Sequence, residues 1–263
     1  MSTLHIYGDS FSTGYGLNKS VGFVQKPFGK YVPYTWDKNI CNFFDYSNVS
    51  NKARPASSNE VIHNTFIGDM INFKRGDTVI IGLSDSSRMS LPINYNKKEV
   101  EYLNINGAIY RESLINSISD NPEVNFIPDY LKPVCSRNNI PITMFTTALK
   151  FYEEWREDET FTKMRYSMLK DRILENIKFL ATLGVTVYVW DSALWYMYEN
   201  INSWTKGKYV DFHWSPNGHR SFLSLLIWCI DNSYNYIDTE LYGNNESAIL
   251  NFSKSKNLDQ YIN

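Results

Sequence analysis

The most informative segment for the fold is Asp77-Thr78-Val79-Ile80-Ile81-Gly82-Leu83. Its apolar, largely β-branched residues run on without alternation, and such a run is typical of a parallel strand that helices cover on both faces. Residues 4–7 and 185–190 have the same character, and residues 49–53 form a weaker example. The sequence therefore predicts several buried, parallel strands.

Helical patterns separate these strands. Four stretches carry large apolar residues at helical spacing: residues 36–44, 60–71, 161–183 and 219–230. Ser58 or Asn59 can cap the second stretch, and Gly184 follows the third as a good C-terminal cap. Strands that alternate with helices predict an α/β fold with a mostly parallel central sheet, in a single domain over residues 1–263.

Two regions fall outside this alternation. From about residue 89 to residue 160, prolines interrupt the pattern, and we predict an inserted, cap-like region over the core. Within it, residues 100–110 alternate around Asn106-Gly107, which is the strongest short-range signal for a β-hairpin. After Asn232 the chain is polar and rich in Asn, so we predict an irregular tail from about residue 233.

Composition narrows the class of function. The 26 basic and 28 acidic side chains give a net charge of −2, which favours neither nucleic acid nor an anionic membrane as partner. No stretch approaches the roughly 20 apolar residues of a membrane span, and the N-terminus does not resemble a signal peptide. We therefore expect a cytoplasmic protein by default, with a virion-associated role also open.

The 3 cysteines form no CxxC pair, which argues against a disulfide framework or a thiolate zinc site.

Gly8-Asp9-Ser10 follows the first predicted strand. In open α/β sheets, ligands bind at the carboxyl ends of the strands. A serine at that edge can act as a nucleophile, but only if a base removes the proton of its hydroxyl. The alternative is a plain tight turn in which Asp9 and Ser10 cap the next segment.

Residues 211–219, Asp-Phe-His-Trp-Ser-Pro-Asn-Gly-His, offer such a base. Asp211 and His213 stand just before a helix that Ser215-Pro216 is well suited to begin. An aspartate that accepts a hydrogen bond from one imidazole nitrogen fixes the tautomer, and the other nitrogen can then take the serine proton. A surface loop, or a metal site formed with Asp9, is the alternative interpretation of the same residues.

Four blocks of sequence, taken together, resemble the SGNH (GDSL-type) hydrolases. Gly8-Asp9-Ser10 and residues 211–219 look like the first and last blocks of that family. Residues 51–59 look like the second block, and Gly82-Leu83-Ser84-Asp85 looks like the third. The blocks follow the family's order over most of the chain, and their spacing is similar to that of phage-encoded members. Residues 89–160 match no block.

The resemblance implies a three-layer α/β/α sandwich of the flavodoxin-like kind and a serine esterase that needs no metal or organic cofactor. Ser10 would be the nucleophile, His213 the general base and then acid, and Asp211 the residue that orients the histidine. The backbone N–H groups of Ser10 and Ala56 would hold the oxyanion. The family often removes acetyl or other acyl groups, so we expect O-acyl esters, first of all O-acetyl esters on a carbohydrate, as substrates.

Several positions depart from the family pattern. Ala56 stands where the second block usually has glycine, although alanine still presents its N–H group. Ser84 stands where the third block usually has an asparagine whose side chain donates to the oxyanion, and a hydroxyl is shorter than a carboxamide. Arg88 could compensate, or could simply be ion-paired. The Asp-x-His spacing is one residue shorter than the commoner form, which leaves Asp191 as a backup acid.

Two further functions stay open at this point. The changed third block favours a non-catalytic protein of the same fold, which would bind a glycan or serve as a structural part of a phage particle. A metal-dependent hydrolase that uses Asp9, Asp211 and His213 is the other alternative.

Overall fold

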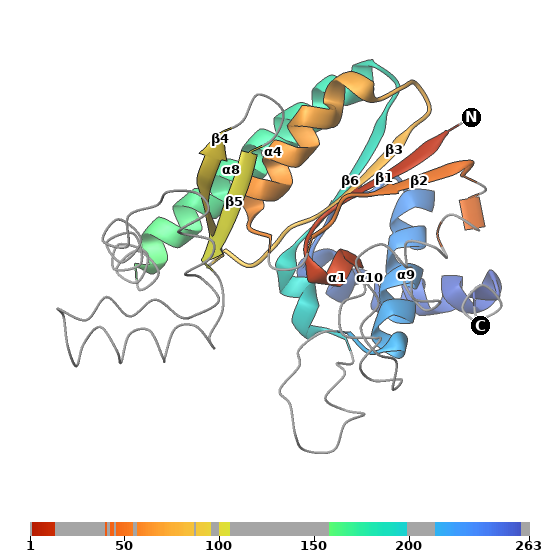
Figure 1. Ribbon diagram of the computed structural model, residues 1–263. Helices are drawn as coiled ribbons and strands as arrows, with labels where there is room; N and C mark the ends of the chain where they lie inside the picture. Colours follow the sequence, from red (N-terminus) through yellow and green to blue (C-terminus); the bar gives the residue numbers. More distant parts are fainter. Residues whose placement is uncertain are drawn as a thin grey trace, which may run out of the picture.

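A five-stranded parallel sheet forms the centre of the protein (Figure 1). The computed structural model describes residues 2–13, 40, 43–44, 46–54, 57–86, 88–95, 100–105, 158–198 and 214–258. The strand order is β2-β1-β3-β6-β7, and every neighbouring pair is parallel. The strands are β1 (Thr3–Tyr7), β2 (Asn48–Asn51), β3 (Thr78–Gly82), β6 (Thr186–Trp190) and β7 (Tyr236–Ile237). The prediction of an α/β fold with a parallel sheet is confirmed.

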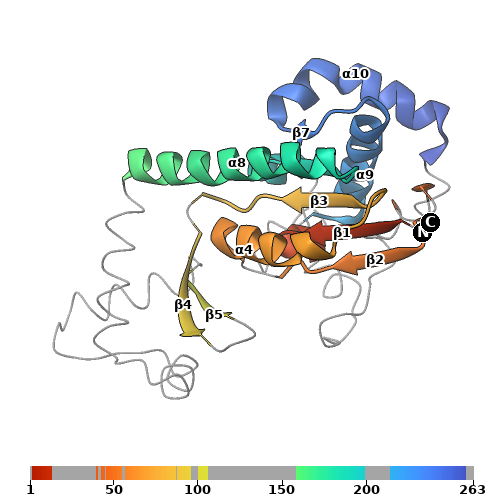
Figure 2. The same ribbon diagram turned by 90° about the horizontal axis from the view of Figure 1, so that it is seen from above.

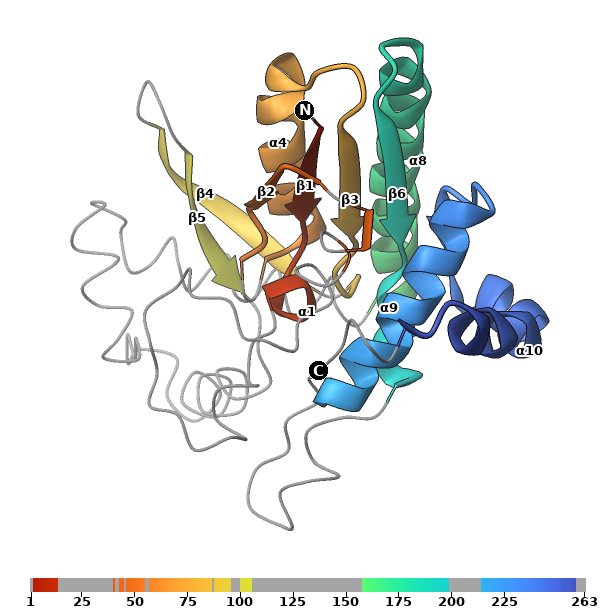
Figure 3. The ribbon, with the colours of Figure 1, turned by 90° about the vertical axis from the view of Figure 1, so that its right-hand side faces the viewer.

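Helices pack on both faces of this sheet (Figure 3). On one face lie α4 (Asn59–Asp69) and α8 (Glu159–Thr182), and on the other lie α9 (Pro216–Asp231) and α10 (Thr239–Ser255). Side chains of β3 alternate between the two cores: Val79 and Ile81 join the first, and Ile80 joins the second. This two-sided burial explains why residues 79–83 are apolar without alternation. No helix within the described ranges is long and apolar enough to cross a membrane.

A separate two-stranded ribbon lies next to α4 (Figure 2). It consists of β4 (Met89–Tyr95) and β5 (Val100–Ile105), which pair antiparallel with a register shift between Pro92 and Asn94. The predicted strand from residue 100 therefore exists, but its described partner precedes it and does not follow Asn106-Gly107. The rest of the predicted insertion, residues 96–99 and 106–157, lies outside the described residues.

The prediction of an irregular tail from about residue 233 is wrong. Residues 236–237 add the edge strand β7, and α10 then runs for 17 residues. Asp238 caps this helix by accepting a hydrogen bond from the N–H of Leu241 at 2.8 Å. Ile249 is buried against the core, so a few well-spaced apolar residues outweigh the polar composition of the segment.

The carboxylate of Asp77 forms hydrogen bonds at the amino-terminal edge of the sheet. Asp77 precedes β3 and is 3% exposed. Its side chain accepts hydrogen bonds from the N–H groups of Thr3 and Lys74 at 2.9 and 2.8 Å, and His5 Nε2 lies 3.3 Å away. Burial alone would raise the pKa of Asp77, but these hydrogen bonds and His5 outweigh it, so the pKa lies below its ordinary value.

We expect Asp77→Ala to lower the free energy of unfolding by about 2–3 kcal/mol, because two N–H groups lose their acceptor. Since the pKa of Asp77 is lowered by folding, its contribution to stability is present above about pH 4 and is lost as the pH falls through the lowered folded-state value. Urea denaturation between pH 7 and pH 3 measures both effects. An Asp77→Ala protein as stable as the unaltered chain at pH 7, or with the same acid sensitivity, would contradict the assignment.

Candidate active site

Ser10 lies at the carboxyl-terminal edge of the sheet. The strand β1 ends at Tyr7, and after Gly8 and Asp9 the chain turns into the short helix α1 (Ser10–Thr13). A Cβ atom on Gly8 would overlap the side chain of Ser12, so a glycine is needed for this close turn. The register pairs Tyr7 with Ile81, which brings the segments that follow β1 and β3 to one edge.

The hydroxyl of Ser10 is buried and makes no hydrogen bond within the described part of the chain. The residue is 3% exposed. Buried hydroxyls in folded proteins are normally paired. Ser12 Oγ and Ser58 Oγ share this state among the described residues, so the position of Ser10 at the sheet edge, and not its unpaired hydroxyl alone, makes it a candidate nucleophile.

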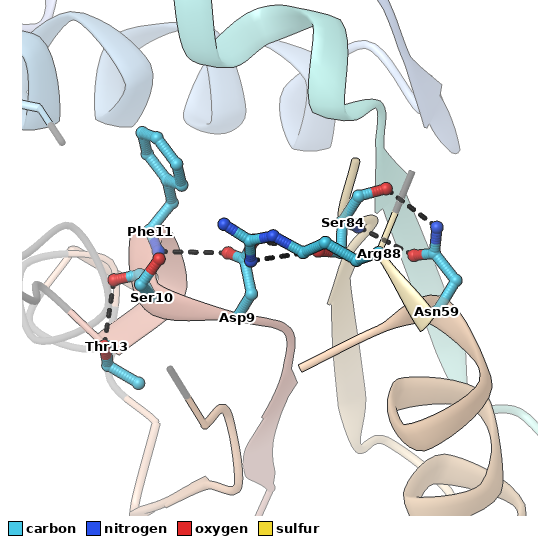
Figure 4. A network of polar contacts seen from close by, with 7 residues as sticks. All are labelled: Asp9, Ser10, Phe11, Thr13, Asn59, Ser84 and Arg88. Carbon is cyan, nitrogen blue, oxygen red and sulfur yellow. Dashed lines mark hydrogen bonds and ion pairs between the residues drawn. The ribbon is translucent and has the colours of Figure 1, made fainter. Parts of the chain in front are cut away.

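Beside Ser10, the buried carboxylate of Asp9 organises a polar network (Figure 4). Asp9 Oδ1 accepts from the N–H of Phe11 at 3.0 Å. Asp9 Oδ2 accepts from Arg88 Nη1 at 2.9 Å and from the hydroxyl of Ser84 at 3.2 Å. Arg88 Nη1 also donates to Ser84 Oγ at 3.1 Å. The negative charge of the motif is thus paired with a cation from the loop after β3.

Asn59 joins the predicted second and third blocks. Its amide Nδ2 donates to the carbonyl of Ser84, and its Oδ1 accepts from the N–H of Ser84, both at 2.7 Å. Ser58, and not Asn59, takes the N-cap position of α4, without a capping hydrogen bond from its side chain. The amide that we expected as a possible cap instead clamps the loop after β3. Ala56 of the second block lies outside the described residues.

The last predicted block reaches the site through Trp214. Asp211 and His213 lie outside the described residues, but Trp214 is fully buried. Its ring centroid lies 5.1 Å from that of Phe11, and its Nε1 donates to the carbonyl of Trp195 at 3.1 Å. The next residue, Ser215, caps α9 as expected by accepting from the N–H of Gly218 at 3.1 Å. The chain after residue 213 therefore packs against the residue that follows Ser10.

Asp191, the backup acid, has structural contacts. Its Oδ1 accepts from the N–H of Ala193 at 2.9 Å, which caps the short 3-10 helix η2 (Ser192–Tyr196). Its Oδ2 accepts from the hydroxyl of Tyr236 at 2.5 Å. Burial and this carboxylate raise the pKa of Tyr236 above its ordinary value, so the tyrosine stays a donor. These contacts link β6 to β7.

Comparison of the chain with protein-family models, with curated proteins and with solved structures gave no match. Within the described ranges, no three His, Cys, Asp or Glu side chains gather as metal ligands would.

Proposed function

We propose that the protein is an SGNH-type serine esterase that hydrolyses O-acyl esters, in particular O-acetyl esters on a carbohydrate. The contact between Phe11 and Trp214 carries this proposal. These two residues directly follow Ser10 and His213 in the chain, and consecutive Cα atoms are about 3.8 Å apart. Their contact brings the chain next to Ser10 close to the chain next to His213, and this supports a shared active site.

The position of Ser10 in the fold supports the same proposal. It follows the carboxyl end of a central strand, where α/β sheets bind their ligands. Helices on both faces of the parallel sheet agree with a three-layer α/β/α sandwich of the SGNH kind. In this proposal the insertion between about residues 89 and 160 forms a cap that shapes the substrate site.

The reaction proceeds in two halves. Ser10 Oγ attacks the ester carbonyl carbon while its proton passes to the imidazole of His213, and the carbonyl electron pair moves onto the oxygen. The tetrahedral oxyanion then collapses, the bond to the sugar oxygen breaks, and the imidazolium protonates the leaving alcohol. Water repeats the sequence on the acyl-enzyme and releases the carboxylic acid. Asp211 orients the imidazole, and the N–H groups of Ser10 and Ala56 donate to the oxyanion.

Labelling with a fluorophosphonate tests this function, because these probes phosphonylate only an activated serine. We expect one phosphonyl group per folded chain, located on Ser10 by peptide mass spectrometry, and none on the urea-unfolded chain. Labelling that persists in strong chelator would exclude the metal-dependent alternative. A folded protein that stays unlabelled would overturn the proposal in favour of a non-catalytic glycan-binding or structural role.

A further inference from the structure

The hydroxyl of Ser84 already donates its hydrogen bond to the carboxylate of Asp9. The distance between Ser84 Oγ and Asp9 Oδ2 is 3.2 Å, and Ser84 is fully buried. A hydroxyl has a single hydrogen, so a donor engaged with a carboxylate is not available to an oxyanion. If the protein is the esterase proposed above, the side-chain donor that the third block normally supplies has to come from another residue.

Arg88 stands next to this position with donors to spare. Its Nη1 binds both Asp9 and Ser84, while within the described part of the chain its Nε and Nη2 contact no acceptor. The side chain is 20% exposed. Figure 4 shows the guanidinium reaching back from its loop to Asp9, with one nitrogen turned toward the side where Ser10 and Phe11 lie. A guanidinium has five N–H donors and keeps its charge at all relevant pH values.

The guanidinium is also held rigidly. Its Cζ lies 4.7 Å from the ring centroid of Trp195, which limits rotation of its plane. Its backbone is fixed from α8, because Arg165 Nη2 donates to the carbonyls of Ser86 and Arg88 at 2.7 and 2.8 Å. Arg165 in turn pairs with Glu60 at 3.3 Å. A donor that is already oriented needs no reorganisation when charge develops in the transition state.

We propose that Arg88 is the side-chain donor to the oxyanion and that Asp9 is the positioning residue that holds it. The same carboxylate accepts from the N–H of Phe11, so one group fixes both the backbone after Ser10 and the guanidinium. Pairing with Asp9 compensates the charge of Arg88 in the ground state, and the free N–H groups add charge-assisted hydrogen bonds as the oxyanion forms.

Steady-state hydrolysis of p-nitrophenyl acetate tests the proposal. We expect Arg88→Met to lower kcat by about 10²–10³-fold with little change in KM, and Ser84→Ala to lower it by less than about tenfold. Since Arg88→Met removes the cation that compensates the buried charge of Asp9, the double variant Asp9→Asn/Arg88→Met is measured as well, because it removes both charges. Lys170→Met, which removes a cation lying 4.0 Å above the ring of Tyr236, is the matched control and keeps full turnover.

Chemical rescue separates a catalytic role from a structural one. Millimolar guanidinium chloride should raise kcat of Arg88→Ala, which keeps Asp9 and leaves room for the ion, whereas sodium chloride at the same concentration should not. A double variant that folds and turns over like the unaltered enzyme would refute the role of Arg88 alone. A large loss in Ser84→Ala with full activity in the double variant would assign the donor to Ser84. Absence of both turnover and fluorophosphonate labelling in the unaltered protein would refute the esterase function itself.

Discussion

We expect Ser10→Ala to remove nearly all of the proposed ester turnover while the fold stays intact. We expect kcat/KM for p-nitrophenyl acetate to fall by about 10³-fold or more, because the nucleophile is lost and only binding and oxyanion contacts remain. The hydroxyl has no hydrogen-bond partner among the described residues. Its removal should therefore change the free energy of unfolding by less than about 1 kcal/mol. Kinetics and urea denaturation on the same preparation check both statements.

The control is Ser12→Ala, one short turn away in α1. Ser12 is 1% exposed, and its Oγ likewise has no partner among the described residues. Its loss should leave turnover intact, which shows that removal of a buried hydroxyl from α1 is harmless by itself. Turnover that survives in Ser10→Ala would eliminate this residue as the nucleophile.

Among the substitutions proposed for this protein, Trp214→Ala should cause the largest loss in the free energy of unfolding. It should also reduce ester turnover. The indole is fully buried, and its ring lies against Phe11 and Trp190 with centroids 5.1 and 5.6 Å away. Truncation leaves a cavity, and we expect a loss of about 3–5 kcal/mol in the free energy of unfolding. Because the ring contacts Phe11, the residue that follows Ser10, we also expect turnover to fall by tenfold or more, since small displacements of catalytic groups are costly.

The control variant Trp228→Ala separates the loss of stability from the loss of turnover. This residue lies near the other end of α9, is 7% exposed and stacks on Tyr234 at 5.2 Å. Its loss should also destabilise the protein, but a fully folded sample should keep its turnover. Equal activity of the two variants, measured where both are folded, would show that Trp214 supports only the core.

The sequence predicts the sheet well because each central strand is buried on both faces. All residues of β3 are buried because helices cover both faces of the sheet, so nearly every position has to be apolar. The same logic fails at α10, where most residues are exposed and burial falls on a few positions such as Ile249. A helix that covers only part of a sheet can be polar over most of its surface, and average composition hides it.

The site is predictable only in part, for a related reason. Order along the chain indicates that the segments after β1 and β3 share one edge, and the structure places Ser10 and Ser84 there. The order along the chain does not indicate which side chains pair across that edge. The clamp of Asn59 on Ser84 and the pairing of Arg88 with Asp9 depend on loop conformations that no periodicity encodes.

The pairing of Asp9 with Arg88 has a consequence for how this protein can change over evolutionary time. The carboxylate is fully buried, so removing the Arg88 cation alone would weaken the compensation of its charge, which is more costly than replacing both partners at once. Natural variants should therefore replace these two positions jointly, and a chain with a neutral residue at 88 should also carry a neutral residue at 9.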